Sequence, residues 1–283
     1  MFEVLEVPPG MNLPFDQGSV ALSSSTLSLV EPPDSVQISA AARTICLSFA
    51  DDPLIAWLRP DASKTWGAQE LQVLKLQERR VQLCRLQRII LQSPSVDEIK
   101  KTSHPSQKAQ EPCQYPTSGS DTGAIAILHP PKGRTPLTLS KVWGLIKLGL
   151  VQLFDEAKDV ALDDRRMKIF YKAHDQCLSK LRRQLNGKLW YLEIIGVHPS
   201  MQGKGVGRAV METVLTYANG QPIVLECTQE ANVQFYRRFG FEVYEETELV
   251  DLSLTAATAA GGRVKLWVMI CNQGRDESSR LDL

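Results

Sequence analysis

Short apolar runs rich in β-branched residues alternate with amphipathic segments along the C-terminal half of the chain. Runs of the first kind predict strands, and apolar residues repeated every three or four positions predict helices. Val206, Val210 and Val214 recur at such a helical spacing. The pattern predicts strands at 189–197, 222–227, 241–249 and 264–270, with helices at 208–218 and 230–239. The C-terminal half therefore has the order β-α-β-α-β-β.

The N-terminal half has a weaker pattern in which helical spacing dominates. Asp52-Pro53 begins a short helix, because Asp caps helix N termini and Pro fits the first turn. The other expected elements are a strand at 36–38, helices at 40–49 and 69–92, a buried strand at 124–128, and helices at 140–154 and 159–181. Together the two halves predict a domain of the α/β (α+β) class.

Two breaks in the pattern divide the chain. Residues 1–34 mix Pro, Ser and Gly without periodicity, which predicts a poorly ordered N-terminal arm. Residues 93–122 are rich in Pro, Ser, Gln and Lys, which predicts a flexible insertion. We expect a single domain over 35–273 that contains this insertion and is followed by a tail at 274–283.

The composition narrows the class of protein. The 283 residues include 32 Lys and Arg against 32 Asp and Glu, so we expect neither a nucleic-acid nor a membrane partner. With 43% hydrophobic residues, the chain is able to bury a core. No apolar run is long enough for a membrane span, and the acidic N-terminal segment does not resemble a secretory signal. The six cysteines form no C-x-x-C pair, which favours reduced thiols, no metal site and a cytoplasmic location, with the nucleus as an alternative.

A glycine-rich loop is the strongest chemical signal. Gly203, Gly205 and Gly207 alternate with other residues where a predicted strand leads into a predicted helix. Glycine allows a tight turn that points main-chain N–H groups outward, and the helix N terminus adds partial positive charge. Lys204 and Arg208 supply cations. The loop therefore predicts binding of a diphosphate, although glycines in an ordinary turn remain an alternative.

Two other nucleotide-binding loops are disfavoured. A dinucleotide fold needs G-x-G-x-x-G directly after the strand, whereas here 198–202 intervene and the spacing is G-x-G-x-G. Glu226 does lie where a ribose ligand is expected, so this alternative stays open. A P-loop needs Ser or Thr after Gly-Lys, but Gly205 follows Gly203-Lys204.

Two ordered motifs resemble the Gcn5-related N-acetyltransferase (GNAT) superfamily. The strand leads through V-x-P at 197–199 into Q-x-x-G-x-G at 202–207, and N-x-x-x-Y-x-x-x-G-F follows at 232–241. DDPL at 51–54 and the Pro pair at 130–131 look most like fungal-type members. The resemblance implies a mixed, mostly antiparallel central sheet with a splayed strand pair, flanked by helices, with extra helices before the CoA-binding half.

The resemblance also implies where acetyl-CoA, the co-substrate, would bind without a metal. Ile195, Gly196 and Val197 would pair their main chain with the pantetheine arm. Asn232 would bond the pantetheine side of the cofactor, with a helix cap as the alternative role. The main chain of the loop would hold the diphosphate through Gln202, Gly203, Lys204, Gly205, Val206, Gly207 and Arg208.

Two residues are candidates for proton transfer. Tyr236 is the expected acid for the departing thiolate, because a phenol is a suitable donor to a thiolate; a packed core aromatic is the alternative. Glu193 is the expected base, because a carboxylate among apolar neighbours has a raised pKa; pairing with an arginine is the alternative. His198 and His174 are the fallback bases.

We therefore predict an N-acetyltransferase that moves an acyl group from CoA to a primary amine by direct attack in a ternary complex. The alternatives are a CoA-binding scaffold of the same fold without turnover and a dinucleotide-binding enzyme. The acceptor stays open between a small molecule and a peptide amine, because no pattern in the first half of the chain selects between them. The protein is expected to be a monomer or a homodimer.

Overall fold

The computed structural model describes residues 28–29, 35–60, 68–102, 120–131, 142, 145, 161–252 and 262–272. Most of the predicted arm, the predicted tail and nearly all of the helix expected at 140–154 lie outside these residues. Among the described residues, no helix has the length and apolar character needed to span a membrane.

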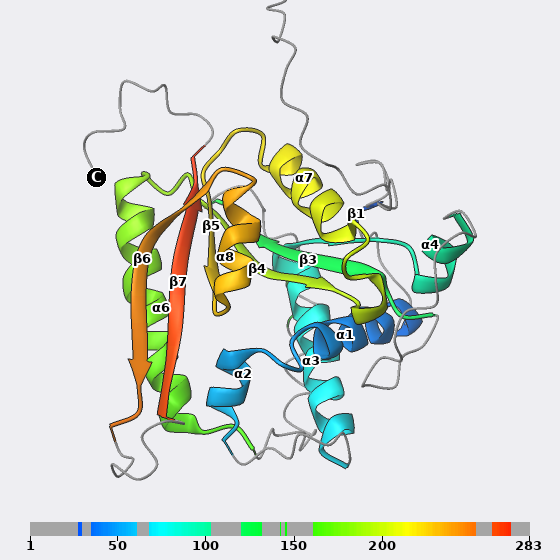
Figure 1. Cartoon of the computed structure of the whole chain (residues 1–283), viewed down its shortest axis with the longest axis horizontal. Coiled ribbons are helices and arrows are strands. Elements are labelled where there is room, and N and C mark those ends of the chain that lie inside the picture. Colours follow the sequence, from blue (N-terminus) through cyan, green and yellow to red (C-terminus); the bar gives the residue numbers. More distant parts are fainter. Residues whose placement is uncertain are drawn as a thin grey trace, which may run out of the picture.

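Seven strands form one mixed sheet in the order β1-β2-β3-β4-β5-β7-β6 (Figure 1). All neighbours pair antiparallel except β4 and β5, which are parallel. The bounds are β1 Ser28–Leu29, β2 Ile89–Gln92, β3 Ala124–His129, β4 Trp190–Val197, β5 Ile223–Cys227, β6 Phe241–Val250 and β7 Arg263–Cys271. The predicted mixed, mostly antiparallel sheet is confirmed.

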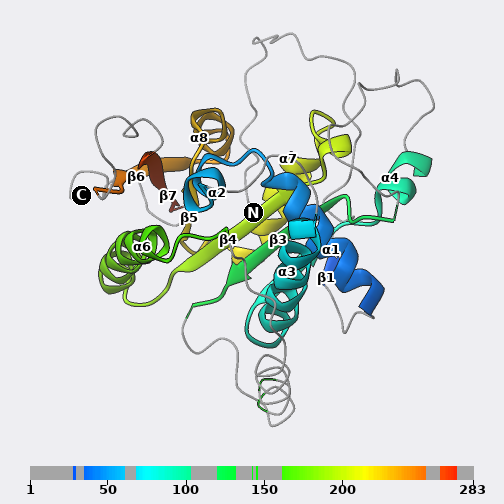
Figure 2. The same ribbon diagram turned by 90° about the horizontal axis from the view of Figure 1, so that it is seen from below.

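Helices cover both faces of this sheet. Figure 2 shows α7 and α8 on one side and α1, α3 and α6 on the other. The bounds are α1 Ser35–Ser48, α2 Pro53–Leu58, α3 Ala68–Gln87, α4 Val96–Thr102, α6 Asp164–Gln184, α7 Val206–Ala218 and α8 Glu230–Arg237, with a 3-10 turn at Pro199–Met201. Helix α2 packs against α6 and the end of β7, where Trp57 and Leu58 are buried beside Val264.

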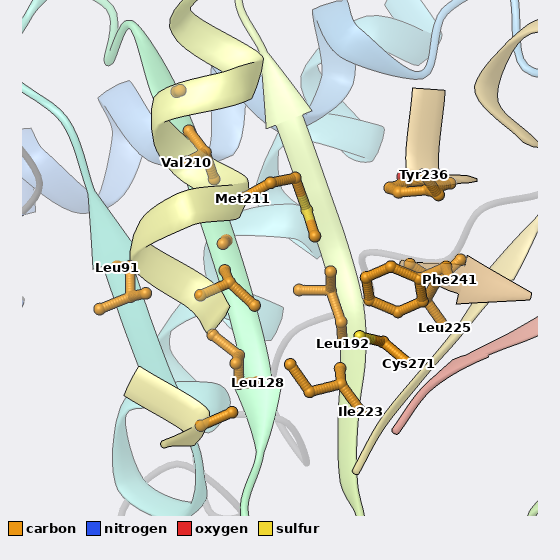
Figure 3. Close-up of a cluster of buried hydrophobic side chains, with 14 of the residues drawn as sticks. Leu91, Leu128, Leu192, Val210, Met211, Ile223, Leu225, Tyr236, Phe241 and Cys271 are labelled. Atoms are coloured by element: carbon orange, nitrogen blue, oxygen red, sulfur yellow. The ribbon is translucent and has the colours of Figure 1, made fainter. Parts of the chain in front are cut away.

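The largest core lies between α7, α8 and the sheet. Alternate residues of β5, namely Ile223, Leu225 and Cys227, face this core. Val210 and Met211 of α7 point toward the strands in Figure 3. Because strand side chains alternate between faces, Val224 lies on the opposite face, in a second core with α6. The two cores fix which side chains of β5 face which layer of helices.

Two elements in the N-terminal half differ from the sequence-based expectation. Residues 36–38, expected as a strand, belong to α1, because Ile38, Ala41 and Ile45 recur at helical spacing and are buried on one face. Residues 89–92, expected as the end of a long helix, form β2, because Ile89 and its neighbours pair with β3. Tertiary pairing overrides the local helical pattern there.

Helix α4 occupies the start of the segment expected to be a flexible insertion. Val96 and Ile99 are each 2% exposed and join the largest core. Ser95 and Glu98 form a capping box, in which the Ser95 N–H donates to the Glu98 carboxylate at 2.8 Å and the Glu98 N–H donates to Ser95 Oγ at 3.3 Å. The expectation of a flexible segment is therefore wrong for residues 96–102.

Shortening Ile99 tests whether α4 is part of the core. We expect Ile99→Ala to lower the free energy of unfolding by about 2 to 4 kcal/mol, because it leaves a cavity in a packed interior. Lys101→Ala, at an exposed position of the same helix, should change it by less than about 0.5 kcal/mol. Urea unfolding of the two variants measures both values, and equal stability would show that α4 does not contribute to the core.

Candidate active site

The parallel pair β4 and β5 separates part of the way along its length. The two strands pair only from Trp190↔Ile223 to Leu192↔Leu225. Beyond that point β4 continues to Val197, paired with β3 on its other edge, while β5 continues to Cys227, paired with β7. A V-shaped opening therefore lies between the ends of the two strands, as the predicted splayed pair requires.

A β-bulge lies where the opening begins. The register between β3 and β4 shifts between Ile127 and Leu128, so that Glu193 has no partner residue on β3. A bulge bends its strand and increases the local twist. The extra residue, Glu193, thus lies where β4 begins to diverge from β5.

The free edge of β4 offers main-chain groups to the opening. The His198 N–H donates to the Gly123 carbonyl on the β3 side at 2.9 Å. Because main-chain groups alternate between the two edges of a strand, those of Ile195 and Val197 point the other way, into the opening. The Val197 carbonyl is already occupied, since it accepts from Ser48 Oγ and Gln202 Nε2 at 3.1 Å each. Both groups of Ile195 and the Val197 N–H can therefore pair with an extended ligand.

Gly196 has a different role from the predicted one. It is paired with Ile125 of β3, so its main chain faces away from the opening. A Cβ at position 196 would lie 2.9 Å from Ser48 Oγ and 3.2 Å from Ser48 Cβ. The glycine therefore lets the end of α1 approach β4 closely.

The glycine turn stands at the open end of the two strands. Gly203 and Gly205 have φ of 71° and 80°, the left-handed region that favours glycine. The first main-chain bond within α7 runs from the Ala209 N–H to the Gly205 carbonyl at 3.1 Å. The N–H groups of Val206, Gly207 and Arg208 consequently have no partner within the helix and point out of its N terminus.

Cations gather at the same place. Partial burial and the charge of Lys100 on α4 lower the pKa of Lys204. Two like charges are therefore close enough to repel each other, which an anion would relieve. Arg208 is partly neutralised, because its Nε donates to Glu212 at 2.7 Å. The turn, the helix N terminus and Lys204 together suit a diphosphate.

The segment from Ser48 to Asp52 crosses the opening and bonds to both strands' ends. Ser48 bonds β4 as described, and Thr228 Oγ1, just beyond β5, donates to Asp52 Oδ2 at 2.6 Å. Asp52 Oδ1 accepts from the N–H groups of Leu54 and Ile55, which confirms its role as the helix cap. Burial raises the pKa of Asp52, although the hydrogen bond from Thr228 opposes this shift.

Tyr236 lies on α8, beside the end of β5. Its side chain is 7% exposed, and its ring lies 5.9 Å from that of Phe241 (Figure 3). Burial raises the pKa of its phenol, with smaller contributions from Cys227 and Asp52, so these groups are its electrostatic neighbours. Tyr236 is thus both a packed aromatic and a protonated hydroxyl near the opening.

Asn232 is exposed on the first turn of α8. The N-cap position of α8 is Gln229, so the alternative of a helix cap at Asn232 is wrong. Its amide lies 3.5 Å from the Gln229 side chain. Its predicted contact with the cofactor stays a prediction.

Glu193 does not have the environment expected of a base. Arg80 of α3 and Arg88, just after the end of that helix, both bind its carboxylate, and His129 Nε2 lies 2.5 Å from Oε2. Burial would raise the pKa of Glu193, but the His129 hydrogen bond and the two guanidinium charges outweigh burial and lower it to about 2. The expected raised pKa is wrong, and the alternative of pairing with arginine is confirmed.

The two fallback histidines have different surroundings. His198 is fully buried, with Nδ1 2.8 Å from Ser200 Oγ and Nε2 3.6 Å from Asp121 Oδ2. It is therefore a structural residue of the V-x-P turn. His174 lies on α6 with Nδ1 2.9 Å from Glu226 Oε2. Sequence reasoning did not connect these two residues, although a single carboxylate in the apolar strand β5 was a usable signal.

No cluster of His, Cys, Asp and Glu suited to a metal occurs among the residues that the structure describes. The groups gathered at the opening are instead main-chain donors, cations, a phenol and paired carboxylates. Such a site can bind an extended thioester ligand and transfer protons.

Comparison with known proteins finds a family match for part of the chain. The family profile described as "Acetyltransferase (GNAT) domain" matches residues 160–243, which contain β4, the glycine turn, β5 and α8. This segment of the chain is therefore similar to acetyltransferase domains of the GNAT superfamily, and the similarity supports acyl transfer from acetyl-CoA as the activity. The likeness to fungal-type members stays a prediction.

Several solved structures are similar at low identity. Arylalkylamine N-acetyltransferase 2 from Aedes aegypti is 14% identical, with 88% of this chain and 99% of that chain covered and a TM-score of 0.49. Polyamine N-acetyltransferase from Drosophila melanogaster is 12% identical, with coverage of 87% and 98% and a TM-score of 0.46. A histone acetyltransferase HPA2-related protein from Corynebacterium glutamicum is 15% identical, with coverage of 89% and 98% and a TM-score of 0.45. These similarities are too distant to transfer a substrate.

The Glu193 cluster predicts a dependence of stability on pH. The folded pKa of about 2 lies below the unfolded value. The cluster therefore stabilises the fold fully above pH ~4.3 and loses this effect as the pH falls through about 2. We expect Glu193→Gln to lower the free energy of unfolding near neutral pH by roughly 2 to 4 kcal/mol. Urea unfolding curves of wild type and variant should converge toward pH 2.

Glu246→Gln is the matched control, because Glu246 also pairs with a cation on a strand but is 49% exposed. It should change the free energy of unfolding far less than Glu193→Gln does at every pH, because an exposed ion pair contributes little. A constant difference between wild type and E193Q down to pH 2 would contradict the assigned pKa.

Proposed function

We propose that the protein acetylates a primary amine by direct attack of the amine on acetyl-CoA, with both substrates bound at once. The observation that carries this proposal is the opening between β4 and β5, with the glycine turn and the N terminus of α7 at its open end. The open end, at the glycine turn, suits a diphosphate. The closed end, where the strands meet, is surrounded by side chains able to transfer protons.

Donor placement follows from the free edge of β4. The N–H groups of Val206, Gly207 and Arg208 hold the diphosphate together with Lys204. The pantetheine arm then extends β4 as a pseudo-strand, bonded to Ile195 and Val197. From Val197 to Leu192 the strand covers roughly 17 Å at about 3.3 Å per residue, a length comparable to that of an extended pantetheine arm. The thioester therefore lies near the point where β4 and β5 separate.

Tyr236 is the acid for the departing thiolate. Burial keeps the phenol protonated over the working pH range, which is the form that a general acid needs. The amine nitrogen forms a bond to the thioester carbon and loses one proton, the carbon–sulfur bond breaks, and the sulfur takes the phenolic proton, which the phenolate regains from solvent. Asp51 and Asp52 stand at the opening and favour a cationic acceptor over an anionic one.

Release of free thiol from acetyl-CoA tests the proposed activity. We expect the purified protein to release thiol only when a primary amine is present, with the acetylated amine detected by mass spectrometry. A panel should include small arylalkylamines, polyamines and a lysine peptide. Binding of CoA without release for any acceptor would favour the scaffold alternative. Binding of NAD(H) in place of CoA would favour the dinucleotide alternative.

Gly203→Asp tests the diphosphate site. We expect the affinity for CoA to fall at least about tenfold, because a carboxylate would face the phosphates at the helix N terminus. Gly187→Asp is the control, since Gly187 also has a positive φ, 74° against 71°, and neither Cβ would meet an atom within 4 Å. Isothermal titration with CoA measures both affinities. Equal loss in the two variants would attribute the effect to backbone strain and not to the site.

Tyr236→Phe tests the acid. The ring and its contact with Phe241 remain, so we expect kcat to fall roughly 100-fold while the Kd of acetyl-CoA changes by less than about twofold. Tyr217→Phe is the control. Tyr217 lies on α7, where its ring packs against Trp190 of β4, and its replacement should leave kcat unchanged. An unchanged kcat in Y236F would assign Tyr236 to packing alone.

A further inference from the structure

A buried imidazole–carboxylate pair lies on the sheet face opposite Tyr236. His174 Nδ1 lies 3.0 and 2.9 Å from the two oxygens of Glu226. Tyr191 Oη donates to Glu226 Oε2 at 3.0 Å, and its ring lies 5.3 Å from that of His174. The side chains of His174 and Glu226 are only 17% and 9% exposed. Three elements, α6, β5 and β4, thus converge on one carboxylate.

The pair stands where the two strands separate. Glu226 directly follows Leu225, the last residue of β5 that pairs with β4. Leu225 and Cys227 face α7 and α8 with Tyr236, so Glu226 between them faces α6. A thioester lying between the strands would have the phenol on one face and the imidazole on the other.

The hydrogen bonds determine what the imidazole can do. A carboxylate against Nδ1 places the proton on that nitrogen and leaves the Nε2 lone pair as the acceptor. Among the described residues, Nε2 of His174 has no hydrogen-bond partner. The imidazole therefore keeps one basic nitrogen that no hydrogen bond within the described part of the protein occupies.

Two other carboxylates at the opening, those of Glu193 and Asp52, are already bound by neighbouring groups. Glu193 is held by Arg80, Arg88 and His129. Asp52 caps α2 with one oxygen and accepts from Thr228 with the other. Protonating either group would break bonds that hold the site together.

The groups that face His174 leave it as the titrating member of its cluster. Burial would lower the pKa of His174, but the hydrogen bond and charge of Glu226, with Asp175, outweigh burial and Arg182 and raise it. Burial raises the pKa of Tyr191 well above its ordinary value. Burial, with Glu245 of β6 and Glu226, raises the pKa of Cys177 to about 12, so the thiol stays protonated.

We propose that His174, oriented by Glu226, is the base that takes the proton from the acceptor amine. This inference rests on the proposed function. As the amine nitrogen bonds to the thioester carbon, it gives one proton to Nε2 and the thiolate takes one from Tyr236. His174 then releases its proton to solvent and Tyr236 regains one, so the protons balance. Glu226 is a positioning residue, since it acts through His174.

The experiment is the pH profile of kcat/KM for the amine that wild type acetylates best. Wild type should lose activity as the pH falls through the pKa of His174. In His174→Gln, kcat should fall roughly 100-fold and the acidic limb due to this residue should disappear, with an unchanged Kd for acetyl-CoA. Glu226→Gln should move that limb to lower pH, because removing the carboxylate charge lowers the imidazole pKa.

His129→Gln is the matched control, because His129 is also a partly buried imidazole paired with a glutamate, and its ring lies 5.2 Å from the same Tyr191. It should keep the acidic limb. NMR titration of the His174 imidazole checks its pKa independently of turnover, in wild type and in E226Q.

The outcomes separate the two proposals. A wild-type enzyme that acetylates the amine, with an H174Q variant that keeps the limb and kcat, overturns only the role of His174. Wild type that binds acetyl-CoA but acetylates no amine overturns the proposed function, and the role of His174 with it.

Discussion

Everything at this site depends on a few missing hydrogen bonds between two neighbouring strands. Parallel strands normally pair along their whole length, yet β4 and β5 do so over a short stretch and then separate. The bulge at Glu193 lies at that point, and Arg80 of α3 and Arg88 just after that helix bind its carboxylate. A polar cluster on one face thus maintains the geometry in which unpaired main chain of β4 is available to a ligand.

The separated strands also divide the chemistry between two layers. On the α7 and α8 side lie the glycine turn and Tyr236, which suit the donor and its leaving group. On the α6 side lies the pair of His174 and Glu226, which suits an acceptor. Because β5 alternates its side chains between these layers, neighbouring residues of this single strand face opposite sides of the proposed site.

The sequence was most informative where local rules decide the structure. Gly203 and Gly205 were found from spacing alone, because a positive φ at a helix start demands glycine. It was least informative where distant segments meet. The pKa of Glu193 is lowered by His129, Arg80 and Arg88, all far away in sequence, and His174 meets Glu226 only because α6 packs on β5. Residues 96–102 were misjudged because composition outweighed the capping box at Ser95 and Glu98.

The close approach of Gly196 to Ser48 has a further consequence. A Cβ at position 196 would be tight against the serine, so a side chain there would require Ser48 to shift. A bulkier residue at 196 would displace the end of α1 and, with it, the Ser48 bond to Val197. Because the segment from Ser48 to Asp52 is continuous, the displacement would also disturb the hydrogen bond between Asp52 and Thr228 at the end of β5. Gly196 therefore supports the segment that crosses the opening without pointing an atom into the opening itself.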